Sequence, residues 1–220
     1  MRSEFWHSVW EEGKIGFHAE KTNPFLMKFW PQMGLSAGDP VFVPLCGKSL
    51  DMLWLAEQKH PVLGVELSPI AAQDFFTENN LPHEVRPEGS FMTYQGGDIE
   101  ILAGNYFDMT AGQFRDIKAV YDRAALVALP ETMRQDYARQ MSELLPAEAK
   151  VLLLTFEYDQ SIVTGPPHSI SYTEVRRLFE SKFLIERLDS RDLIEKAPRF
   201  KSAGLDSFVQ SIYLLDKLDY

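Results

Sequence analysis

Residues 41–66 read VFVPLCGKSLDMLWLAEQKHPVLGVE, and this stretch decides the fold. An apolar run at 41–45 ends in a turn that contains Gly47, and an amphipathic segment follows. A second apolar run, 62–65, then stops at the acidic residue Glu66. This succession of strand, turn, helix, strand and acid is typical of the first half of a nucleotide-binding α/β unit. An acid about 20 residues after the glycine turn commonly binds ribose hydroxyls.

The turn of this unit is unusual because it lacks the G-x-G-x-x-G pattern. Gly47 is its only glycine, and Pro44 and Cys46 occupy neighbouring positions. The three-glycine pattern lets the backbone approach a pyrophosphate, so its absence weakens a dinucleotide interpretation and favours a cofactor with a ribose but no phosphate. S-adenosylmethionine is such a cofactor. The β-α-β unit alone still permits a nicotinamide-dependent oxidoreductase, and Glu66 could instead be a solvated acid capping a helix that starts near Ser68.

Length and composition narrow the class of protein. The 220 residues fit a single α/β domain spanning 1–220, and 45% hydrophobic residues are ordinary for a folded soluble chain. A net charge of −10 argues against nucleic acid as a partner and favours small-molecule substrates. The N-terminus has no apolar core of a secretory signal, and no window reaches the ~20 apolar residues of a membrane span. We therefore expect a cytoplasmic protein, and nothing in the sequence demands more than a monomer.

The residues that often carry redox or metal chemistry show no diagnostic spacing. The single cysteine, Cys46, excludes an intrachain disulfide, and a buried packing role is the favoured interpretation. The five histidines are scattered without a metal-binding motif, so no metal site is expected.

The N-terminal part, residues 1–34, is expected to form a helical cover. Apolar positions at spacings of three and four predict a helix over Ser3–Glu12 that carries Trp6 and Trp10 on one face. On spacing alone, such an aromatic stripe is more often core than ligand contact. A second helix is predicted over Thr22–Met33, with Thr22 as its N-cap.

The rest of the chain alternates strands and helices and ends in two strands. The region 81–97, rich in proline and glycine, is interpreted as an irregular excursion or a small hairpin, and Ser171 with Glu174 matches a capping box. The two last strands are expected to pair antiparallel. The predicted segments are a helix from Ser68-Pro69 to 79–80, strands 98–103 and 117–121, a helix 130–145, a central strand 151–156, a helix 171–182, and strands 183–191 and 207–215.

In a doubly wound sheet, ligands bind at the carboxyl ends of the strands. The residues that the sequence places at these ends are Leu45-Cys46-Gly47, Glu66, Asn105-Tyr106 and Asp122-Arg123. The carboxylate of Glu66 can accept two charge-assisted hydrogen bonds from a vicinal diol. For Arg123, the structural alternative is a buried ion pair with Asp122 or another acid.

Several blocks, in order over nearly the whole chain, resemble the thiopurine S-methyltransferase family, in its bacterial branch. The blocks are Trp6 and Trp10, Gly13-Lys14, Phe17-His18, Pro44-Leu45-Cys46-Gly47-Lys48-Ser49, Met52–Ala56, Gly64–Ser68, Tyr121–Ala128, Gly165-Pro166-Pro167 and Arg199–Gly204. The resemblance implies a class I methyltransferase, a Rossmann-like fold with a doubly wound, mostly parallel sheet, a C-terminal antiparallel strand pair and N-terminal helices covering the cofactor.

The resemblance also implies site residues. For S-adenosylmethionine they are Trp6, Trp10, Phe17, Leu45, Gly47, Glu66, Asn105, Tyr106 and Arg123. For the acceptor they are Phe17, Arg123 and Arg199, the two arginines being the catalytic candidates. The pair Asn105-Tyr106 departs from the small polar and aliphatic residues of the family, and Ala203 stands where some members have tryptophan. Without the resemblance, Arg199 would be interpreted as a solvated surface residue.

The implied reaction moves a methyl group to the sulfur of a thiopurine or aryl thiol. Alignment of the acceptor, the methyl group and the leaving sulfur can contribute about 7–11 kcal/mol. An arginine beside the acceptor would favour its anionic form, with water as proton carrier. Bacterial members are also linked to selenium and tellurium compounds, hence to metalloid detoxification. A non-catalytic nucleotide sensor on the same fold remains the alternative from a different class.

Overall fold

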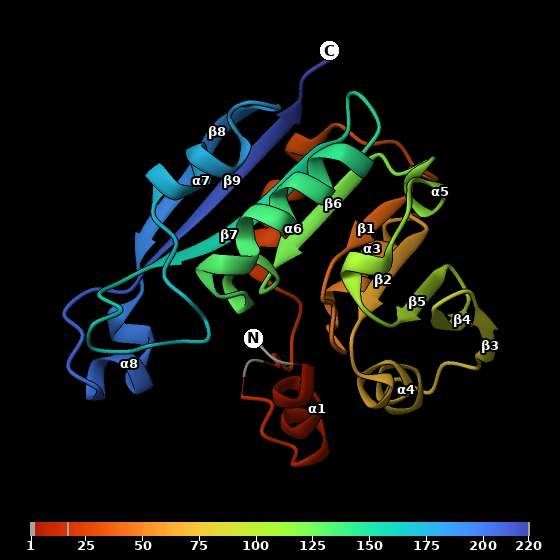
Figure 1. Ribbon diagram of the computed structural model, residues 1–220, viewed down its shortest axis with the longest axis horizontal. Helices are drawn as coiled ribbons and strands as arrows, with labels where there is room; N and C mark the ends of the chain where they lie inside the picture. The colour runs from red at the N-terminus through yellow and green to blue at the C-terminus, as the bar shows by residue number, and fades with distance from the viewer. Residues whose placement is uncertain (1–2, 17, 220) are drawn as a thin grey trace. The chain divides into compact units, whose positions relative to one another are not determined.

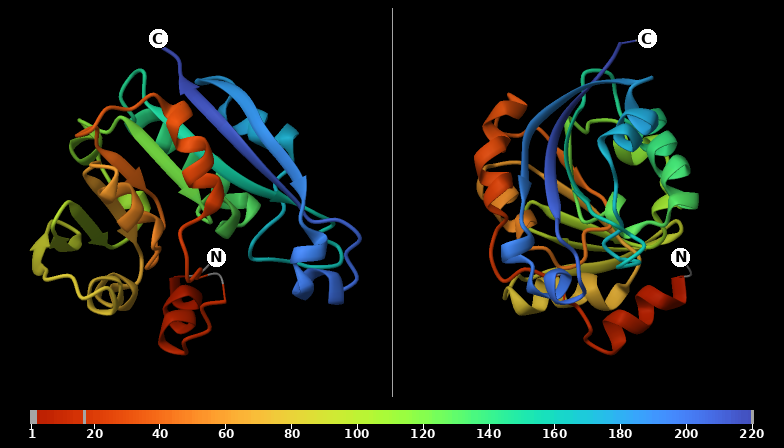
Figure 2. Two further views of the ribbon diagram at one scale, coloured as in Figure 1. Left: turned by 180° about the vertical axis from the view of Figure 1, so that it is seen from behind. Right: turned by 90° about the vertical axis from the view of Figure 1, so that its left-hand side faces the viewer.

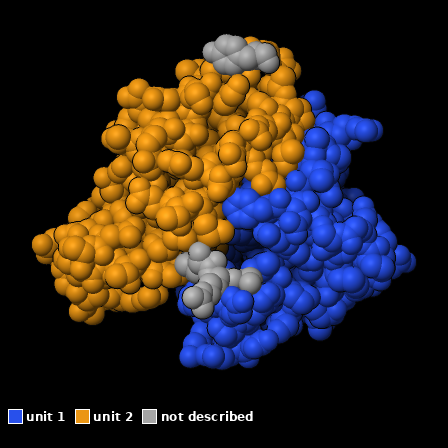
Figure 3. Space-filling view, viewed as in Figure 1, with its two compact units in different colours: residues 1–121 blue, residues 122–220 orange. Residues whose placement is uncertain are grey.

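The computed structural model of the chain describes residues 3–16 and 18–219 (Figure 1). The chain divides into two compact units, residues 1–121 and residues 122–220, which Figure 3 colours separately. The boundary falls inside strand β6 (Ala119–Arg123).

Unit 1 contains the stretch 41–66. Its parallel strands β1 and β2 form where the apolar runs were predicted, with a helix, α3, between them. The elements are α1 (Ser3–Glu11), α2 (Pro24–Phe29), η1 (Trp30–Met33), β1 (Val41–Val43), α3 (Asp51–Glu57), β2 (Val62–Glu66), α4 (Pro69–Glu78), β3 (Glu84–Glu88), β4 (Phe91–Gly96), β5 (Ile99–Ala103), η2 (Tyr106–Asp108), α5 (Ala111–Phe114) and most of β6.

The strand order in unit 1 is β3-β4-β5-β2-β1-β6. Strand β1 pairs in parallel with β2 and with β6, and β2 pairs in parallel with β5. The region 81–97 forms the hairpin β3–β4, and β4 pairs antiparallel with β5, so the hairpin extends the sheet at one edge. Strands β1 and β2 are almost wholly buried, which explains why their sequences are continuous apolar runs and do not alternate.

The second helix differs from the prediction at both ends. Asn23 is the N-cap, and its side chain accepts a hydrogen bond from the main-chain N of Phe25 at 2.9 Å; Thr22 lies outside the helix. The α-helix ends at Phe29, and Trp30–Met33 is a 3₁₀ turn containing Pro31. Proline has no N–H for the helical hydrogen bond, so regular α-helix does not extend through Pro31.

Unit 2 carries the end of β6 and the C-terminal strands. Strand β9 pairs antiparallel with both β7 and β8, so the predicted antiparallel terminal pair is confirmed (Figures 1 and 2). The elements after β6 are η3 (Leu126–Ala128), α6 (Glu131–Leu144), β7 (Lys150–Glu157), α7 (Tyr172–Phe179), β8 (Phe183–Asp192), η4 (Ile194–Lys196), α8 (Pro198–Ser202) and β9 (Val209–Lys217). The prediction of an α/β fold with parallel and antiparallel strand pairs in these places is confirmed.

Candidate active site

The turn after β1 adopts a strained backbone conformation. Leu45 has φ of 46° and Gly47 has φ of 52°, so two of its residues are left-handed. Glycine accepts this region without cost, but for a leucine it costs about 1–3 kcal/mol and persists only where the surroundings enforce it. Such strain is typical of functional turns, and here it aims the main-chain N–H of Gly47 at a side chain from the next strand.

That side chain is Glu66, the last residue of β2. One carboxylate oxygen, Oε2, accepts a hydrogen bond from the N–H of Gly47 at 2.9 Å, and Oε1 accepts one from the N–H of Ser68 at 2.8 Å. Glu66 is only 6% exposed, so the alternative of a solvated surface acid is wrong. Each oxygen keeps a further lone pair, so the fixed carboxylate can still accept hydrogen bonds from a vicinal diol.

Burial sets the electrostatics of this carboxylate. Desolvation raises the pKa of Glu66 above its ordinary value, while the N–H groups of Ser68, Gly47 and Leu67 act in the opposite direction. A ligand that donates hydrogen bonds to Glu66 would therefore compensate the buried charge. This is the arrangement expected for a carboxylate that binds ribose hydroxyls.

The aromatic residues of α1 were expected to cover the cofactor. The ring of Trp10 lies against the turn: a Cβ atom added at Gly47 would come within 3.2 Å of Cζ2 of Trp10. Trp10 is 7% exposed, whereas Trp6 is half-buried and makes an edge contact with Phe5. The structure therefore brings Trp10 against Gly47, whose N–H donates to Glu66. Phe17, which was assigned to both cofactor and acceptor, lies outside the described residues.

Asn105 and Tyr106 follow β5 as predicted, and the structure gives both a local packing role. The side chain of Asn105 accepts a hydrogen bond from the N–H of Phe107 at 3.2 Å and so caps η2. Tyr106 is buried and stacks on Phe42 of β1, with ring centroids 6.4 Å apart. Their assignment to the adenine side of the cofactor stays a prediction.

Cys46 was interpreted as a buried packing residue, and the structure confirms this. Its Sγ would lie 2.8 Å from a Cβ atom added at Gly64, so the thiol packs on the bare backbone of β2. Burial, followed by the charge of Glu66, raises the pKa of Cys46 well above its ordinary value. A thiol held in this form is a poor nucleophile.

Strand β6 ends with Asp122 and Arg123, which the sequence had placed just beyond it. Asp122 is fully buried; Oδ1 accepts a hydrogen bond from the N–H of Leu126 at 3.1 Å, and Oδ2 accepts one from the hydroxyl of Tyr137 at 2.7 Å. Both oxygens are therefore engaged within unit 2 by groups other than Arg123. This arrangement does not favour the alternative that Arg123 exists to neutralise Asp122.

Arg199 lies on the short helix α8 and is exposed. The next residue of the same helix, Phe200, is buried. Phe200 stacks on Phe208 with ring centroids 4.2 Å apart and also contacts Tyr158. These residues, with Leu205, form a separate aromatic cluster in unit 2. The cluster holds α8 against the segment that follows β7, so the position of Arg199 is fixed by packing although its side chain is exposed.

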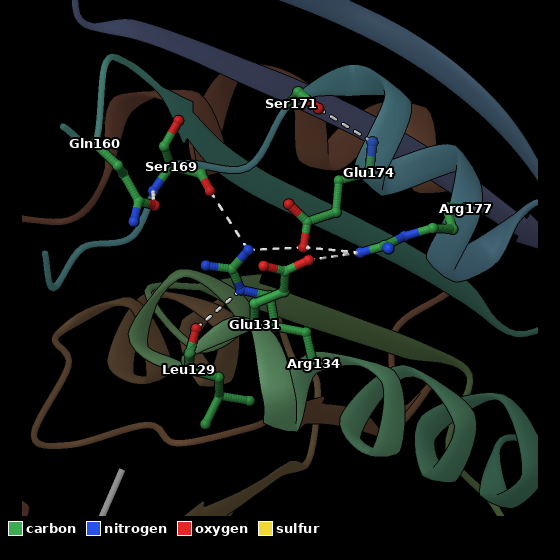
Figure 4. A network of polar contacts seen from close by, with 8 residues as sticks. All are labelled: Leu129, Glu131, Arg134, Gln160, Ser169, Ser171, Glu174 and Arg177. Atoms are coloured by element: carbon green, nitrogen blue, oxygen red, sulfur yellow. Dashed lines mark hydrogen bonds and ion pairs between the residues drawn. The ribbon is translucent and has the colours of Figure 1, made fainter. Parts of the chain in front are cut away.

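The segment 158–171, which contains Gly165-Pro166-Pro167, is held by a polar network (Figure 4). Arg134 on α6 lies at its centre: Nε donates to the carbonyl of Leu129 at 2.9 Å, and one terminal nitrogen donates to Glu174 at 2.7 Å and to the carbonyl of Ser169 at 3.5 Å. Ser169 in turn donates its N–H to the side chain of Gln160. The segment is thus a loop of unit 2 that side-chain hydrogen bonds hold in place.

The capping box predicted for α7 is only half formed. Ser171 Oγ accepts a hydrogen bond from the N–H of Glu174 at 3.2 Å, as expected. The carboxylate of Glu174 pairs with the buried Arg134, and this ion pair replaces the expected return to the N-cap. An ion pair with a guanidinium that is 3% exposed outcompetes a bond at the helix end.

Sequence reasoning missed Arg134, Tyr158 and His168, which all contribute to this loop. Arg134 could have been found, because it precedes Tyr137, Ala138 and Met141 at helical spacing and so lies on the buried face of α6. The other two follow no period. Among the described residues, no group of three or more potential metal ligands gathers in one place. Residues 3–16 and 18–219 also include no helix long and apolar enough to span a membrane.

Comparisons with known proteins agree with this geometry. The family model described as Thiopurine S-methyltransferase matches residues 1–218. A thiopurine S-methyltransferase of Pseudomonas putida is 44% identical over 217 residues, covering 99% of this chain and 100% of the relative. One of Methylococcus capsulatus is 45% identical over 216 residues, covering 98% and 97%.

Solved structures agree on the fold. The 1,6-didemethyltoxoflavin-N1-methyltransferase of Burkholderia thailandensis, solved with bound 1,6-didemethyltoxoflavin and S-adenosylhomocysteine, superimposes with a TM-score of 0.67 at 18% identity, covering 99% of this chain and 87% of that one. The predicted methyltransferase fold is therefore confirmed, and an oxidoreductase is not supported. The chain belongs to the thiopurine S-methyltransferase family, whose members are S-adenosylmethionine-dependent enzymes.

Proposed function

We propose that this protein transfers the methyl group of S-adenosylmethionine to the sulfur of a thiopurine or an aryl thiol. The observation that carries the proposal is the carboxylate of Glu66, buried at the end of β2 and fixed by the N–H groups of Gly47 and Ser68. The names of the family and of its curated relatives support thiopurines as the acceptor class. A cytoplasmic monomer, folded as one domain over residues 1–220, remains part of the proposal.

Unit 1 has the groups that the cofactor requires. Glu66 would accept the ribose hydroxyls, and the turn at Gly47 offers no phosphate cradle, in keeping with a phosphate-free cofactor. The indole of Trp10, packed on Gly47, can interact with a sulfonium through its π face. When bound, S-adenosylmethionine supplies an electrophilic methyl group. Trp6, Phe17, Leu45, Asn105 and Tyr106 complete the proposed set.

Unit 2 contributes the cationic groups that suit an electron-rich sulfur. Arg199 is exposed, and the aromatic cluster anchors the backbone of the helix from which its side chain extends. Arg123 follows the buried Asp122, whose oxygens are engaged elsewhere. A cation beside the acceptor lowers the pKa of a thiol and stabilises the thiolate that attacks the methyl carbon.

The proposal is tested by a methyl-transfer screen with labelled cofactor. The acceptors are thiopurines, aryl thiols, selenols and the tellurium analogues, which decides whether metalloid compounds are substrates. Labelled product from thiopurines or aryl thiols is expected. Binding of S-adenosylhomocysteine without any methylated product would show a non-catalytic sensor instead.

The role of Arg199 is tested by Arg199→Ala. We expect turnover of the acceptor to fall about tenfold or more, with the affinity for S-adenosylhomocysteine unchanged in calorimetry. Lys201→Ala is the matched control, because Lys201 lies on the same helix and is exposed in an ion pair with Glu195. If Arg199→Ala weakened cofactor binding and left turnover intact, its acceptor role would be refuted.

A further inference from the structure

Lys48 directly follows Gly47 in the turn after β1, and the proposed function gives it no role. Its side chain is buried, which is unusual for a lysine, because a buried ammonium group loses its hydration. Nζ donates to both carboxylate oxygens of Glu78, at 2.6 and 2.7 Å. Glu78 is the last residue of α4. The ion pair therefore connects the Gly47 turn, residues 44–49, with the end of that helix.

The two partners of this ion pair differ in exposure. The side chain of Lys48 is 9% exposed, whereas that of Glu78 is 52% exposed. An ion pair between two solvated side chains contributes little to stability. Here the ammonium group has lost most of its water, so its charge depends on the carboxylate. Without Glu78, the side chain of Lys48 would have to turn toward solvent, and its backbone is part of the turn.

Helix α4 is packed firmly enough to serve as an anchor. It contacts strands β2, β4 and β5. A Cβ atom added at Gly96 of β4 would lie 2.9 Å from Cε1 of Phe76, so the helix packs closely on this strand. A side chain at the end of such a helix therefore offers a fixed point to the turn. The fully buried residues of its inner face are Ala71, Ala72, Phe75 and Phe76.

The same helix is joined to the turn at its other end. Ser68, the N-cap residue of α4, donates its main-chain N–H to Oε1 of Glu66 at 2.8 Å, and Gly47 donates its N–H to Oε2 at 2.9 Å. The turn is thus connected to α4 twice, through Glu66 at the start of the helix and through Lys48 at its end. All of these groups belong to unit 1.

The turn needs such support because its backbone is strained. Leu45 and Gly47 have φ of 46° and 52°, and a leucine persists in this region only where its surroundings enforce it. The N–H of Cys46 donates to the carbonyl of Val65 at 2.9 Å, which holds the first half of the turn against β2. The ion pair of Lys48 holds the second half.

We infer that the Lys48–Glu78 ion pair is a positioning device for cofactor binding. It keeps the N–H of Gly47 directed at Glu66 before the cofactor arrives, and neither partner has to touch the cofactor. The inference rests on the proposed cofactor site at Glu66 and deepens it. A protein whose turn is ordered in only a fraction of its molecules binds with an affinity reduced by that fraction. An ordered fraction of about a tenth therefore raises the dissociation constant about tenfold.

The first test measures the dissociation constant of S-adenosylhomocysteine by calorimetry. The proteins are the wild type, Lys48→Met, Glu78→Gln and the double variant. Each single variant removes the ion pair and is expected to bind about tenfold more weakly. The double variant should bind no more weakly than the weaker of the two, because both changes remove one interaction. Arg86→Met is the matched control with unchanged affinity, since Arg86 forms ion pairs with Glu88 and Glu100 elsewhere in unit 1.

The second test does not need the cofactor, because it follows hydrogen exchange of the Gly47 amide by NMR. In unliganded Glu78→Gln this amide should exchange faster than in the wild type. The N–H of Val62, which donates to the carbonyl of Asp98 at 2.8 Å, should exchange at the wild-type rate. Saturation with S-adenosylhomocysteine should restore the protection of Gly47.

The outcomes separate positioning from the other roles that Lys48 could have. Additive losses in the double variant, or a loss in Lys48→Met alone, would indicate direct contact with the cofactor and overturn the positioning role. Equal acceleration of exchange at Gly47 and Val62 would show a merely structural ion pair, and unchanged affinity in both single variants would equally overturn the inference. Failure of the wild type to bind S-adenosylhomocysteine would instead overturn the proposed cofactor site at Glu66, and the inference with it.

Discussion

Two buried carboxylates lie at strand ends, Glu66 at the end of β2 in unit 1 and Asp122 near the end of β6 in unit 2. Glu66 is 6% exposed and Asp122 is fully buried. Burial raises the pKa of both, that of Asp122 to about 6. By sequence pattern alone the two positions look alike, since each acid follows an apolar strand.

The two carboxylates differ in their hydrogen-bond partners. Glu66 is held by the main-chain N–H groups of two turns, those of Gly47 and Ser68. Asp122 bonds to the hydroxyl of Tyr137 on α6 and to the N–H of Leu126, so it ties a helix and a turn to the strand. We therefore expect Glu66, which is fixed by backbone groups, to accept hydrogen bonds from a ligand, and Asp122, which joins a helix to a strand, to serve stability.

The largest effect expected from this comparison is on stability, from Asp122→Ala. The change removes the carboxylate that accepts hydrogen bonds from the hydroxyl of Tyr137 and the N–H of Leu126. Loss of each hydrogen bond to the buried carboxylate costs about 1–3 kcal/mol, so the free energy of unfolding should fall by about 2–6 kcal/mol. Denaturant unfolding measures it. A loss below 1 kcal/mol would show that Asp122 is not structural.

The second prediction concerns pH and Asp122→Asn. The pKa of Asp122 is about 6 in the folded protein against 3.8 for the ordinary side chain, so the folded state binds more protons between these values. Stability from this group is therefore full below the lower pKa and is lost as pH rises through the upper one, a change of about 3 kcal/mol.

Asparagine does not titrate, so the variant should lack this loss. The difference in unfolding free energy, variant minus wild type, should rise by about 3 kcal/mol between about pH 4 and about pH 6.5, and stay level above it. Chemical denaturation at a series of pH values measures the difference and cancels the other titrating groups. A difference independent of pH would mean that Asp122 keeps an ordinary pKa.

The third prediction moves to the other carboxylate, with Glu66→Gln. The amide keeps the shape but removes the charge that strengthens hydrogen bonds from a ribose diol. Affinity for S-adenosylhomocysteine should weaken by about 1–3 kcal/mol, measured by calorimetry. Asp122→Asn serves as the control for loss of a buried negative charge, and its affinity should stay that of wild type. Equal loss in both variants would remove the contrast between the two acids.

Much of unit 1 could be predicted because local pattern decides it. The apolar runs at 41–45 and 62–65 and the acid after them can form little else than a β-α-β unit. The placement of Leu45, Gly47 and Glu66 at strand ends follows from it. The second helix was predicted less well, because its cap depends on a choice between Thr22 and Asn23 that propensity does not resolve.

Unit 2 contains contacts that the sequence pattern could not predict. The contacts of Arg134 reach 35 and 40 residues along the chain to Ser169 and Glu174, and no local period encodes such pairs. The carboxylate of Glu174 was for that reason assigned to its own helix cap. The strand pattern placed Arg123 at a strand end, but its assignment to the acceptor, like that of Arg199, came from the family resemblance.

The smallest effect on stability is expected from a change at Ser68, close to Glu66. The sequence predicts that the hydroxyl of Ser68 caps a helix, whereas in the structure its main-chain N–H makes the hydrogen bond. Ser68 is the N-cap of α4 by position, but its hydroxyl makes no capping bond and is buried without a partner among the described residues. Its main-chain N–H, which donates to Glu66, is the group that matters. Ser68→Ala keeps that N–H and removes the unsatisfied hydroxyl, so stability should stay level or rise by up to about 1 kcal/mol. Thermal unfolding measures the stability of this variant, and calorimetry with S-adenosylhomocysteine measures its affinity, which should not change. Weaker binding would show that the hydroxyl itself contacts the cofactor.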